Sequence, residues 1–192
     1  MTAPLEVQPR RATTVDKVCA IVVSFFPDVA TLRKLITATL PQVDTLVIVD
    51  NGASDDTFNG FCVGVENDRI VILKQPGNIG LAAAFNCGIV WARKNGFSHV
   101  LLLDQDSEPA QGMVGDLIRA YAASSVRRKT AAVGPRFHDT REDRYAPFVR
   151  IGFPVSRKMY SSEKNGLVNC DFLISSGSLI PLAALDDIAY DG

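Results

Sequence analysis

Short continuous runs of apolar residues alternate along the chain with segments whose apolar residues recur at helical spacing. Four runs rich in Val, Ile and Leu predict strands at residues 18–24, 45–49, 69–73 and 99–103. Continuous runs of this kind are typical of strands buried on both faces, as in a parallel sheet. Apolar residues at helical spacing predict helices at residues 32–40, 81–93 and 111–123. This alternation predicts an α/β fold in which helices flank a mainly parallel central sheet.

The later part of the chain has a weaker pattern. A short strand is expected at residues 131–134, and residues 136–164 are irregular, with short β segments near 148–153. Residues 166–174 predict a further strand, which a turn rich in Ser and Gly ends before a short segment at 181–185. The clear alternation of strands and helices therefore stops near the middle of the chain.

These patterns divide the chain into three expected parts. Residues 1–17 form a polar N-terminal tail, residues 18–135 an α/β half, and residues 136–192 the start of a second half. The sequence ends on Asp-Asp-Ile-Ala-Tyr-Asp-Gly, which is charged and turn-like and contains no closing helix. We therefore expect the second half to be truncated and the sequence to be an N-terminal fragment of a longer protein.

Composition and charge narrow the classes of protein. The 192 residues are 47% hydrophobic and 21% charged, which is typical of one globular domain and excludes a disordered, collagen-like or coiled-coil chain. The net charge of -1 supplies no overall field that would attract nucleic acid. The apolar runs are too short to cross a bilayer, and the first 17 residues do not resemble a signal peptide, so we expect a cytoplasmic protein. The cysteines lack metal-site spacing and are expected to be reduced thiols; they are Cys19, Cys62, Cys87 and Cys170.

Candidate chemistry lies where the predicted strands end, because ligands of open parallel sheets bind outside the carboxyl ends of the strands. Ser24 and Phe25 end the first strand, Asp50 ends the second, and Asp104 and Asp106 follow the fourth. In an extended Asp-x-Asp segment the two carboxylates point to the same side. Such a pair suits Mg²⁺ or Mn²⁺ whose coordination is completed by phosphate oxygens and water. Helix caps or solvated turns would explain the same acidic residues without a ligand.

Several other features carry weaker signals. The chain has no Gly-x-Gly-x-x-Gly, P-loop or Gly-x-Ser-x-Gly motif, and His99 and His138 have no nucleophile partner by motif, so both are expected to be structural or on the surface. Asn78 is expected to cap the helix that follows it, with Gly80 allowing an anion to approach the helix N-terminus. Residues 127–150 have a local net charge of +4, which fits either a solvated face or a platform for an anionic lipid surface or a diphosphate-bearing acceptor.

Five segments, taken together and in this order, resemble glycosyltransferase family 2, and within it the rhamnosyltransferases of bacterial surface-polysaccharide assembly. They are VVSFFPD, LVIVDNGASDD, QPGNIGLAAAFNCGI, HVLLLDQDSEP and DFLISSGSLIP. The resemblance implies a Rossmann-like layer of the GT-A type and an inverting, metal-assisted sugar transfer with Mg²⁺ or Mn²⁺. It implies dTDP-rhamnose as donor and a polysaccharide or lipid-linked glycan as acceptor, with peripheral contact at the inner face of the cell membrane. The half at 18–135 would bind the nucleotide sugar, and the part at 136–192 would begin the acceptor side.

The resemblance also implies roles for individual residues. The nucleotide base would lie between the end of the first strand and Asp50, which would accept a hydrogen bond from the N3–H group of the base. Asp104 would lie near the ribose and, with Asp106, bind the metal that bridges the phosphates. Ser176 and Gly177 would face the sugar and the acceptor. The donor-binding residues implied are Ser24, Phe25, Asp50, Asn51, Asn78, Gly80, Asp104 and Gln105, of which Gln105 replaces the more frequent middle residue of the Asp-x-Asp motif.

The general base of the inverting reaction has no match in the sequence. In the family it lies in an acidic motif after the Gly-Ser-Leu-like loop, so we expect it beyond Gly192. Asp186, Asp187 and Asp191 match only the segment that leads to this motif. The sequence thus predicts a chain that binds a nucleotide sugar and transfers the sugar poorly.

Three alternatives remain at this point. The chain could be a family 2 transferase that uses another donor, such as a UDP-hexose, or a non-catalytic module that binds nucleotide sugars. A nucleotidyltransferase would be expected to carry a Gly-rich loop with Arg or Lys after the first strand, where this chain has Phe25, Phe26 and Pro27. The oligomeric state is not predicted by any feature of the sequence.

Overall fold

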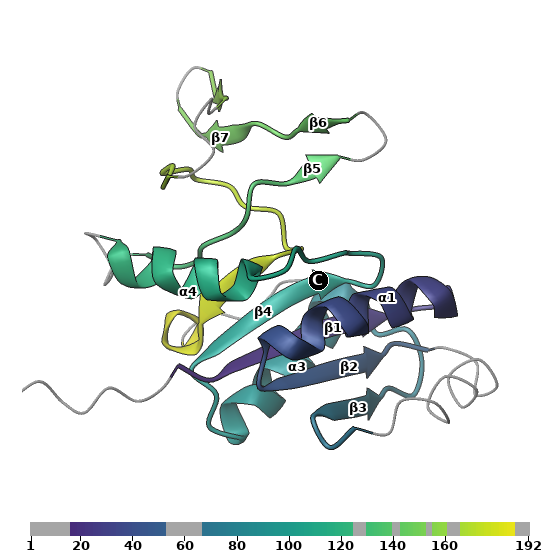
Figure 1. Cartoon of the computed structure of the whole chain (residues 1–192). Helices are drawn as coiled ribbons and strands as arrows, with labels where there is room; N and C mark the ends of the chain where they lie inside the picture. Colours follow the sequence, from purple (N-terminus) through teal and green to yellow (C-terminus); the bar gives the residue numbers. More distant parts are fainter. Residues whose placement is uncertain are drawn as a thin grey trace, which may run out of the picture.

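A five-stranded sheet forms the centre of the protein in a computed structural model (Figure 1). The strands, in spatial order, are β3 (Ile70–Lys74), β2 (Thr45–Asp50), β1 (Val18–Ser24), β4 (His99–Asp104) and β9 (Ser178–Pro181). The first four are parallel to one another, and β9 runs antiparallel to β4 at the edge. The structure describes residues 16–52, 67–124, 130–139, 143–152, 155–160 and 166–186. The expected α/β fold with a mainly parallel sheet is confirmed.

Helices cover both faces of the sheet. On one face, β1 residues such as Ala20 and Val22 pack with α1 (Val29–Thr39) and α4 (Met113–Ala123). On the other face, Ile21 and Val23 pack with Phe85 and other residues of α3 (Leu81–Lys94). Because successive side chains of a strand point to opposite faces, a continuous apolar run is what a two-sided core requires. All seven residues of β1 are buried accordingly.

The register of the parallel strands brings three predicted site residues to one edge. Ser24 at the end of β1 pairs with Asp50 at the end of β2, and Val23 pairs with Asp104 at the end of β4. The carboxyl ends of these strands therefore lie side by side, with β1 in the middle. The edge carries the loops that follow all three strands.

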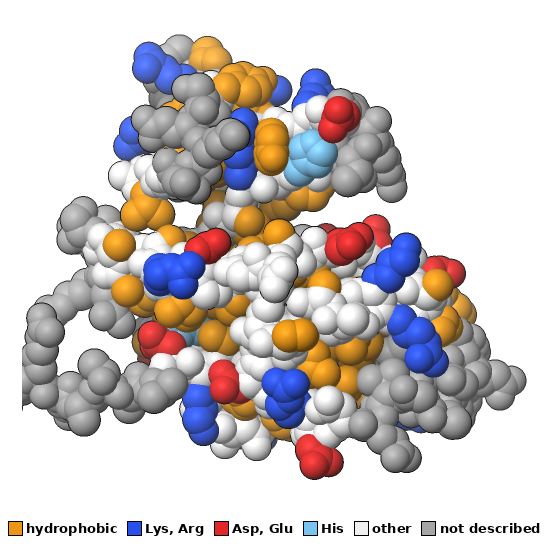
Figure 2. All heavy atoms as spheres, viewed as in Figure 1, with side chains coloured by type: hydrophobic (Ala, Val, Ile, Leu, Met, Phe, Trp, Pro, Cys, Tyr) orange, Lys and Arg blue, Asp and Glu red, His pale blue; other side chains and the backbone are white. Residues whose placement is uncertain are grey.

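A smaller part with short strands lies beside the main sheet (Figure 1). It contains two antiparallel pairs, β5 (His138–Asp139) with β6 (Arg144–Tyr145), and β7 (Phe148–Arg150) with β8 (Arg157–Met159). Figure 2 shows that apolar and basic side chains gather on the surface of this part. Its exposed apolar residues include Phe137, Tyr145, Ile151, Val155 and Tyr160.

The prediction for residues 166–174 was wrong. This segment makes no strand, and its only bridge joins Phe172 to Val149. The strand lies later, at β9, and is followed by the short helix η3 (Leu182–Leu185). Strand β9 pairs with the edge of β4, and all four of its residues are buried. Leu167 and Phe172, in the segment predicted as a strand, are exposed. The expected strand at 131–134 is reduced to an isolated bridge between Val133 and Leu179.

The helix boundaries differ slightly from the predicted ones. Helix α1 begins at Val29, earlier than expected, because Asp28 accepts a hydrogen bond from the Thr31 backbone N–H at 2.8 Å and so caps the helix. Helix α4 begins at Met113 because Gly112 has a left-handed conformation (φ 81°), which does not continue a helix. Helix α1 is followed by η1 (Leu40–Gln42), a short 3-10 turn that contains Pro41.

Three cysteines and both histidines lie within the described residues. Cys19, Cys87 and Cys170 are free thiols, and burial raises the pKa of Cys19 to about 12, which keeps that thiol protonated. Cys62 lies outside the described residues. His99 is buried at the start of β4, whereas His138 is exposed on β5. No helix in the described ranges is both long enough and apolar enough to cross a bilayer.

Candidate functional site

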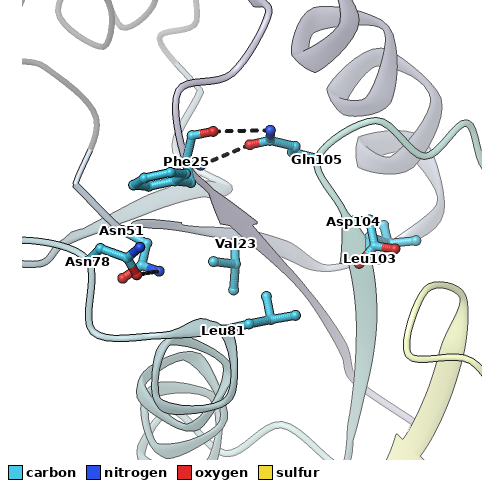
Figure 3. Close-up of a pocket in the computed structure, with 8 residues that line it drawn as sticks. All are labelled: Val23, Phe25, Asn51, Asn78, Leu81, Leu103, Asp104 and Gln105. Atoms are coloured by element: carbon cyan, nitrogen blue, oxygen red, sulfur yellow. Dashed lines mark hydrogen bonds between the residues drawn. The ribbon is translucent and has the colours of Figure 1, made fainter. Parts of the chain in front are cut away.

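A hollow of about 290 Å³ opens at the carboxyl edge of the sheet (Figure 3). Side chains from four separate segments surround it: the end of β1, the loop after β2, the loop that leads into α3, and the end of β4 with the residue that follows it. The lining residues are Val23, Phe25, Asn51, Asn78, Leu81, Leu103, Asp104 and Gln105. Five of these, at positions 25, 51, 78, 104 and 105, were predicted at the donor from the sequence.

The side-chain amide of Gln105 joins two walls of the hollow. Its Oε1 accepts a hydrogen bond from the Phe25 backbone N–H at 2.8 Å, and its Nε2 donates one to the Phe25 carbonyl oxygen at 3.2 Å (Figure 3). The ring of Phe25 is partly exposed and packs edge-on against Phe26, with 4.6 Å between the ring centroids. The loop after β4 is thus tied directly to the loop after β1.

Two asparagines join the loop after β2 to the loop before α3. Asn51, which is buried, donates from Nδ2 to Oδ1 of Asn78 at 3.1 Å, and its Oδ1 accepts from the Ile79 backbone N–H at 3.0 Å. The Asn78 Oδ1 also accepts from the Gly80 backbone N–H at 2.9 Å. These bonds fix the loop before α3 against the end of β2.

Glycine is required at one point of this contact. Gly52 has a φ of 104°, and a Cβ atom there would lie 3.0 Å from the Asn78 backbone nitrogen. A side chain at this position would push the two loops apart, in addition to the strain of a left-handed conformation. Gly80, which also has positive φ (86°), is the N-cap of α3 and has open space around it.

The acidic pair follows directly from β4. Asp104 is partly buried, and this burial, followed by the nearby charge of Asp106, raises the pKa of the Asp104 carboxyl. Asp106 is exposed on the turn just beyond it. Two carboxylates that repel each other at the rim of a hollow fit a divalent cation, which would relieve this repulsion. The described part of the chain has no cluster of three or more His, Cys, Asp or Glu side chains suited to a metal.

The predicted acceptor-side residues lie next to this acidic pair. Ser176 Oγ accepts a hydrogen bond from the Asp104 backbone N–H at 3.3 Å and is also hydrogen-bonded to the Ser107 hydroxyl. Gly177 donates from its backbone N–H to the Leu102 carbonyl oxygen at 2.7 Å. The turn before β9 is therefore fastened to the end of β4. Ser107 was not predicted, although it directly follows the Asp-Gln-Asp segment.

Not every predicted residue faces the hollow. Ser24, Asp50, Gly80 and Asp106 lie at the same edge but are not among its lining residues. Ser24 is fully buried, and Asp50 is only 5% exposed. Both continue the alternation of the strand residues that pack toward α1, whereas Val23 belongs to the face covered by α3. The apolar walls Val23, Leu81 and Leu103 were missed as site residues, because in sequence they are indistinguishable from core residues.

One downstream acidic residue, Asp186, lies away from this edge. Asp186 follows η3 and forms an ion pair with Arg93 at 3.4 Å, near the C-terminal end of α3. In the register of the sheet, Pro181 at the end of β9 pairs with His99 at the start of β4, so Asp186 follows the opposite edge from Asp104. Asp187 and Asp191 lie outside the described residues.

The architecture, with a mainly parallel five-stranded sheet between helices, is that of GT-A proteins. The chain belongs to glycosyl transferase family 2, whose family model matches residues 20–187. Two solved structures share the fold. A mannosyltransferase from Pyrobaculum calidifontis, PcManGT, in complex with GDP-Man and Mn²⁺, has a TM-score of 0.51 and 16% identity over 66% of this chain and 36% of that one. TarS 1-349 of S. aureus has a TM-score of 0.51 and 16% identity over 89% of this chain and 48% of that one.

Two curated proteins are similar in sequence. The dTDP-rhamnosyl transferase RfbF of Shigella flexneri is 26% identical over 166 residues, which are 86% of this chain and 54% of that protein. The polyprenol monophosphomannose synthase of Mycolicibacterium smegmatis is 28% identical over 123 residues, which are 63% of this chain and 44% of that protein. The chain therefore spans about half the length of the curated relatives it matches.

Proposed function

We propose that this chain binds a nucleoside diphosphate sugar in the hollow at the carboxyl edge of its sheet and serves a metal-assisted, inverting glycosyl transfer. The observation that carries the proposal is that Asp104, two residues before Asp106, shares one hollow with Phe25 and Asn51. A hollow with mainly apolar walls and a few polar groups suits a base and a sugar. The acidic rim suits a diphosphate only when a cation is present, because the carboxylates alone would repel it.

Asp104 and Asp106 would hold Mg²⁺ or Mn²⁺ together with the diphosphate oxygens. When bound, the metal supplies Lewis-acid stabilisation of the negative charge on the departing nucleoside diphosphate. The chain's own residues have other tasks. The ring of Phe25 bounds the hollow on the β1 side, Asn51 holds the loop before α3, and Ser176 holds the turn before β9 at the end of β4.

For the donor we propose dTDP-rhamnose. The support is the resemblance of the five sequence segments to rhamnosyltransferases, together with the similarity to the Shigella protein named as a dTDP-rhamnosyl transferase. Mannose donors are the second candidate, because the similar Mycolicibacterium protein is named for mannose chemistry. A UDP-hexose remains the third.

For the organisation of the chain we propose a donor half at residues 18–135 and the beginning of an acceptor side at 136–192. Ser176 and Gly177 would meet the sugar and an acceptor of the polysaccharide or lipid-linked glycan class. Their hydrogen bonds to the end of β4 support this proposal, because they hold the turn before β9 next to Asp104.

The test is a calorimetric titration of the chain with dTDP-rhamnose, GDP-mannose and UDP-glucose, each with Mn²⁺ and with EDTA. We expect binding that is tightest for dTDP-rhamnose and that EDTA weakens. The variant Asp106→Asn should lose about tenfold or more in affinity with Mn²⁺ present, because it removes a metal ligand. The matched control is Asp116→Asn, which changes an exposed carboxylate on α4 outside the hollow and should bind like the unaltered chain.

Two results would count against the proposal. If Asp106→Asn and the unaltered chain bind the nucleotide sugar with equal affinity in the presence of Mn²⁺, Asp106 does not bind the metal. If the folded chain binds none of the three nucleotide sugars with Mn²⁺ present, the proposed donor site is wrong.

A further inference from the structure

The middle residue of the Asp-Gln-Asp segment has both ends of its amide occupied by another part of the chain. Gln105 accepts from the Phe25 N–H at 2.8 Å and donates to the Phe25 carbonyl oxygen at 3.2 Å, across 80 positions of sequence. Both hydrogen bonds go to one residue, so the planar amide fixes the position and the orientation of that residue's backbone. Figure 3 shows the amide reaching across the top of the hollow to Phe25.

The segment that Gln105 holds is one that needs support. Phe26, the next residue, has a φ of 44°, a left-handed conformation that is strained for an aromatic residue. Strained backbone of this kind persists only where surrounding contacts enforce it. On the other side, the Asn51 backbone N–H donates to the Ser24 carbonyl oxygen at 2.8 Å. The end of β1 is therefore held between the loop after β2 and the loop after β4.

The contact is specific for an amide. The Phe25 backbone presents one donor and one acceptor, and only a side chain with both groups at the right distance matches them. A glutamate would keep an acceptor for the N–H but would place a second oxygen against the Phe25 carbonyl. A methionine would keep the length and lose both hydrogen bonds.

We propose that Gln105 is a positioning residue that sets the place of the Phe25 wall of the nucleotide hollow, and that it is not itself a ligand of the donor. The proposal rests on the proposed function. It deepens that function, because the same two hydrogen bonds tie the segment 104–106, at the end of β4, to the wall carrying Phe25. We call the two hydrogen bonds between Gln105 and the Phe25 backbone the clamp. It fixes the distance between the proposed diphosphate end of the site and the Phe25 wall.

The experiment compares the unaltered chain with Gln105→Met and Gln105→Glu, using two readouts. The first is the affinity for dTDP with Mn²⁺ by calorimetry, where each variant should lose about tenfold, as expected for the loss of one or two hydrogen bonds that preorganise a site. The second is the backbone amide signal of Phe25 in a protein labelled with isotopic phenylalanine, measured without nucleotide. In both variants this signal should shift and its proton should exchange faster with water.

The matched control is Gln42→Met. Gln42 also joins separate segments through its amide, donating to the Ala38 and Ala110 carbonyl oxygens and accepting from the Val114 N–H, but it does not line the hollow. This variant should lose stability while keeping both the affinity for dTDP and the Phe25 signal. It separates a general loss of stability from an effect on the Phe25 wall.

The outcomes are distinguishable. If the Gln105 variants lose affinity while the Phe25 signal stays unchanged, Gln105 contacts the nucleotide directly and the positioning role is wrong. If the Phe25 signal moves and the affinity for dTDP does not, the clamp exists but does not shape the site, and the proposal is likewise overturned. If the unaltered chain binds no nucleotide, the proposed function itself fails, whatever the Phe25 signal shows.

Discussion

At the scale of single residues, side-chain amides and a hydroxyl join the loops at the carboxyl edge of the sheet. Gln105 binds the backbone of Phe25, Asn51 binds the loop before α3, and Ser176 binds the backbone of Asp104. The resemblance to family 2 transferases implied that these polar residues belong to the site. It could not predict that their polar groups face the chain's own backbone, since this depends on loop conformations that no local pattern encodes.

Gly177 offers a test of how tightly the turn before β9 is fastened. It has a φ of 84°, and a Cβ atom there would lie 2.8 Å from Cγ of Pro135, whose ring has little freedom to move. We predict that Gly177→Ala lowers the free energy of unfolding by about 2 to 4 kcal/mol, from strain and overlap together. Urea denaturation would measure this change.

Gly96→Ala is the control for that prediction. Gly96 also has a positive φ (73°), but nothing lies within 4 Å of its added Cβ, so only the backbone strain remains. We expect a loss of about 1 kcal/mol. Equal losses in the two variants would mean that the contact with Pro135 does not hold the turn.

At the scale of elements, the sequence predicted the four parallel strands and misplaced the antiparallel strand β9. Strands β1, β2 and β4 consist of continuous apolar runs, which their two-sided burial requires. Strand β3, at the other edge of the sheet, is also a run of apolar residues but is only partly buried. Strand β9 has only four residues and pairs with a strand that lies 76 or more positions earlier in the chain. The choice between β9 and residues 166–174 is decided by which segment reaches the free edge of β4, a long-range property.

The start of α1 leads to a prediction about pH. Hydrogen bonds from the Thr31 hydroxyl and then from the Thr31 backbone N–H lower the pKa of the Asp28 carboxyl below its ordinary value. A lowered pKa in the folded state means that this carboxylate stabilises the fold above the unfolded-state pKa, and that the contribution disappears as the pH falls through the folded-state value. We predict that Asp28→Ala is less stable than the unaltered chain at about pH 7, and that the difference narrows at about pH 2.5. Urea denaturation at both pH values measures it, and a difference that is independent of pH would rule out an ionic cap.

At the scale of the whole molecule, the topology brings the site together. The end of β1 lies between the ends of β2 and β4, so residues separated by more than 50 positions in the chain surround one hollow. The rule that ligands bind at the carboxyl ends of parallel strands was enough to predict this edge from the sequence. Strand alternation separates Val23 and Asp104 from the buried Ser24 and Asp50, although Leu103 also lines the hollow and belongs to the face of Ser24 and Asp50.

The most direct test of the central claim is a crystal structure of the chain with dTDP and Mn²⁺. The account predicts that the metal lies at Asp104 and Asp106 with the diphosphate, and that the base lies in the hollow beside Phe25 and Asn51. A nucleotide bound elsewhere, or a metal that contacts neither of the two carboxylates, would contradict it.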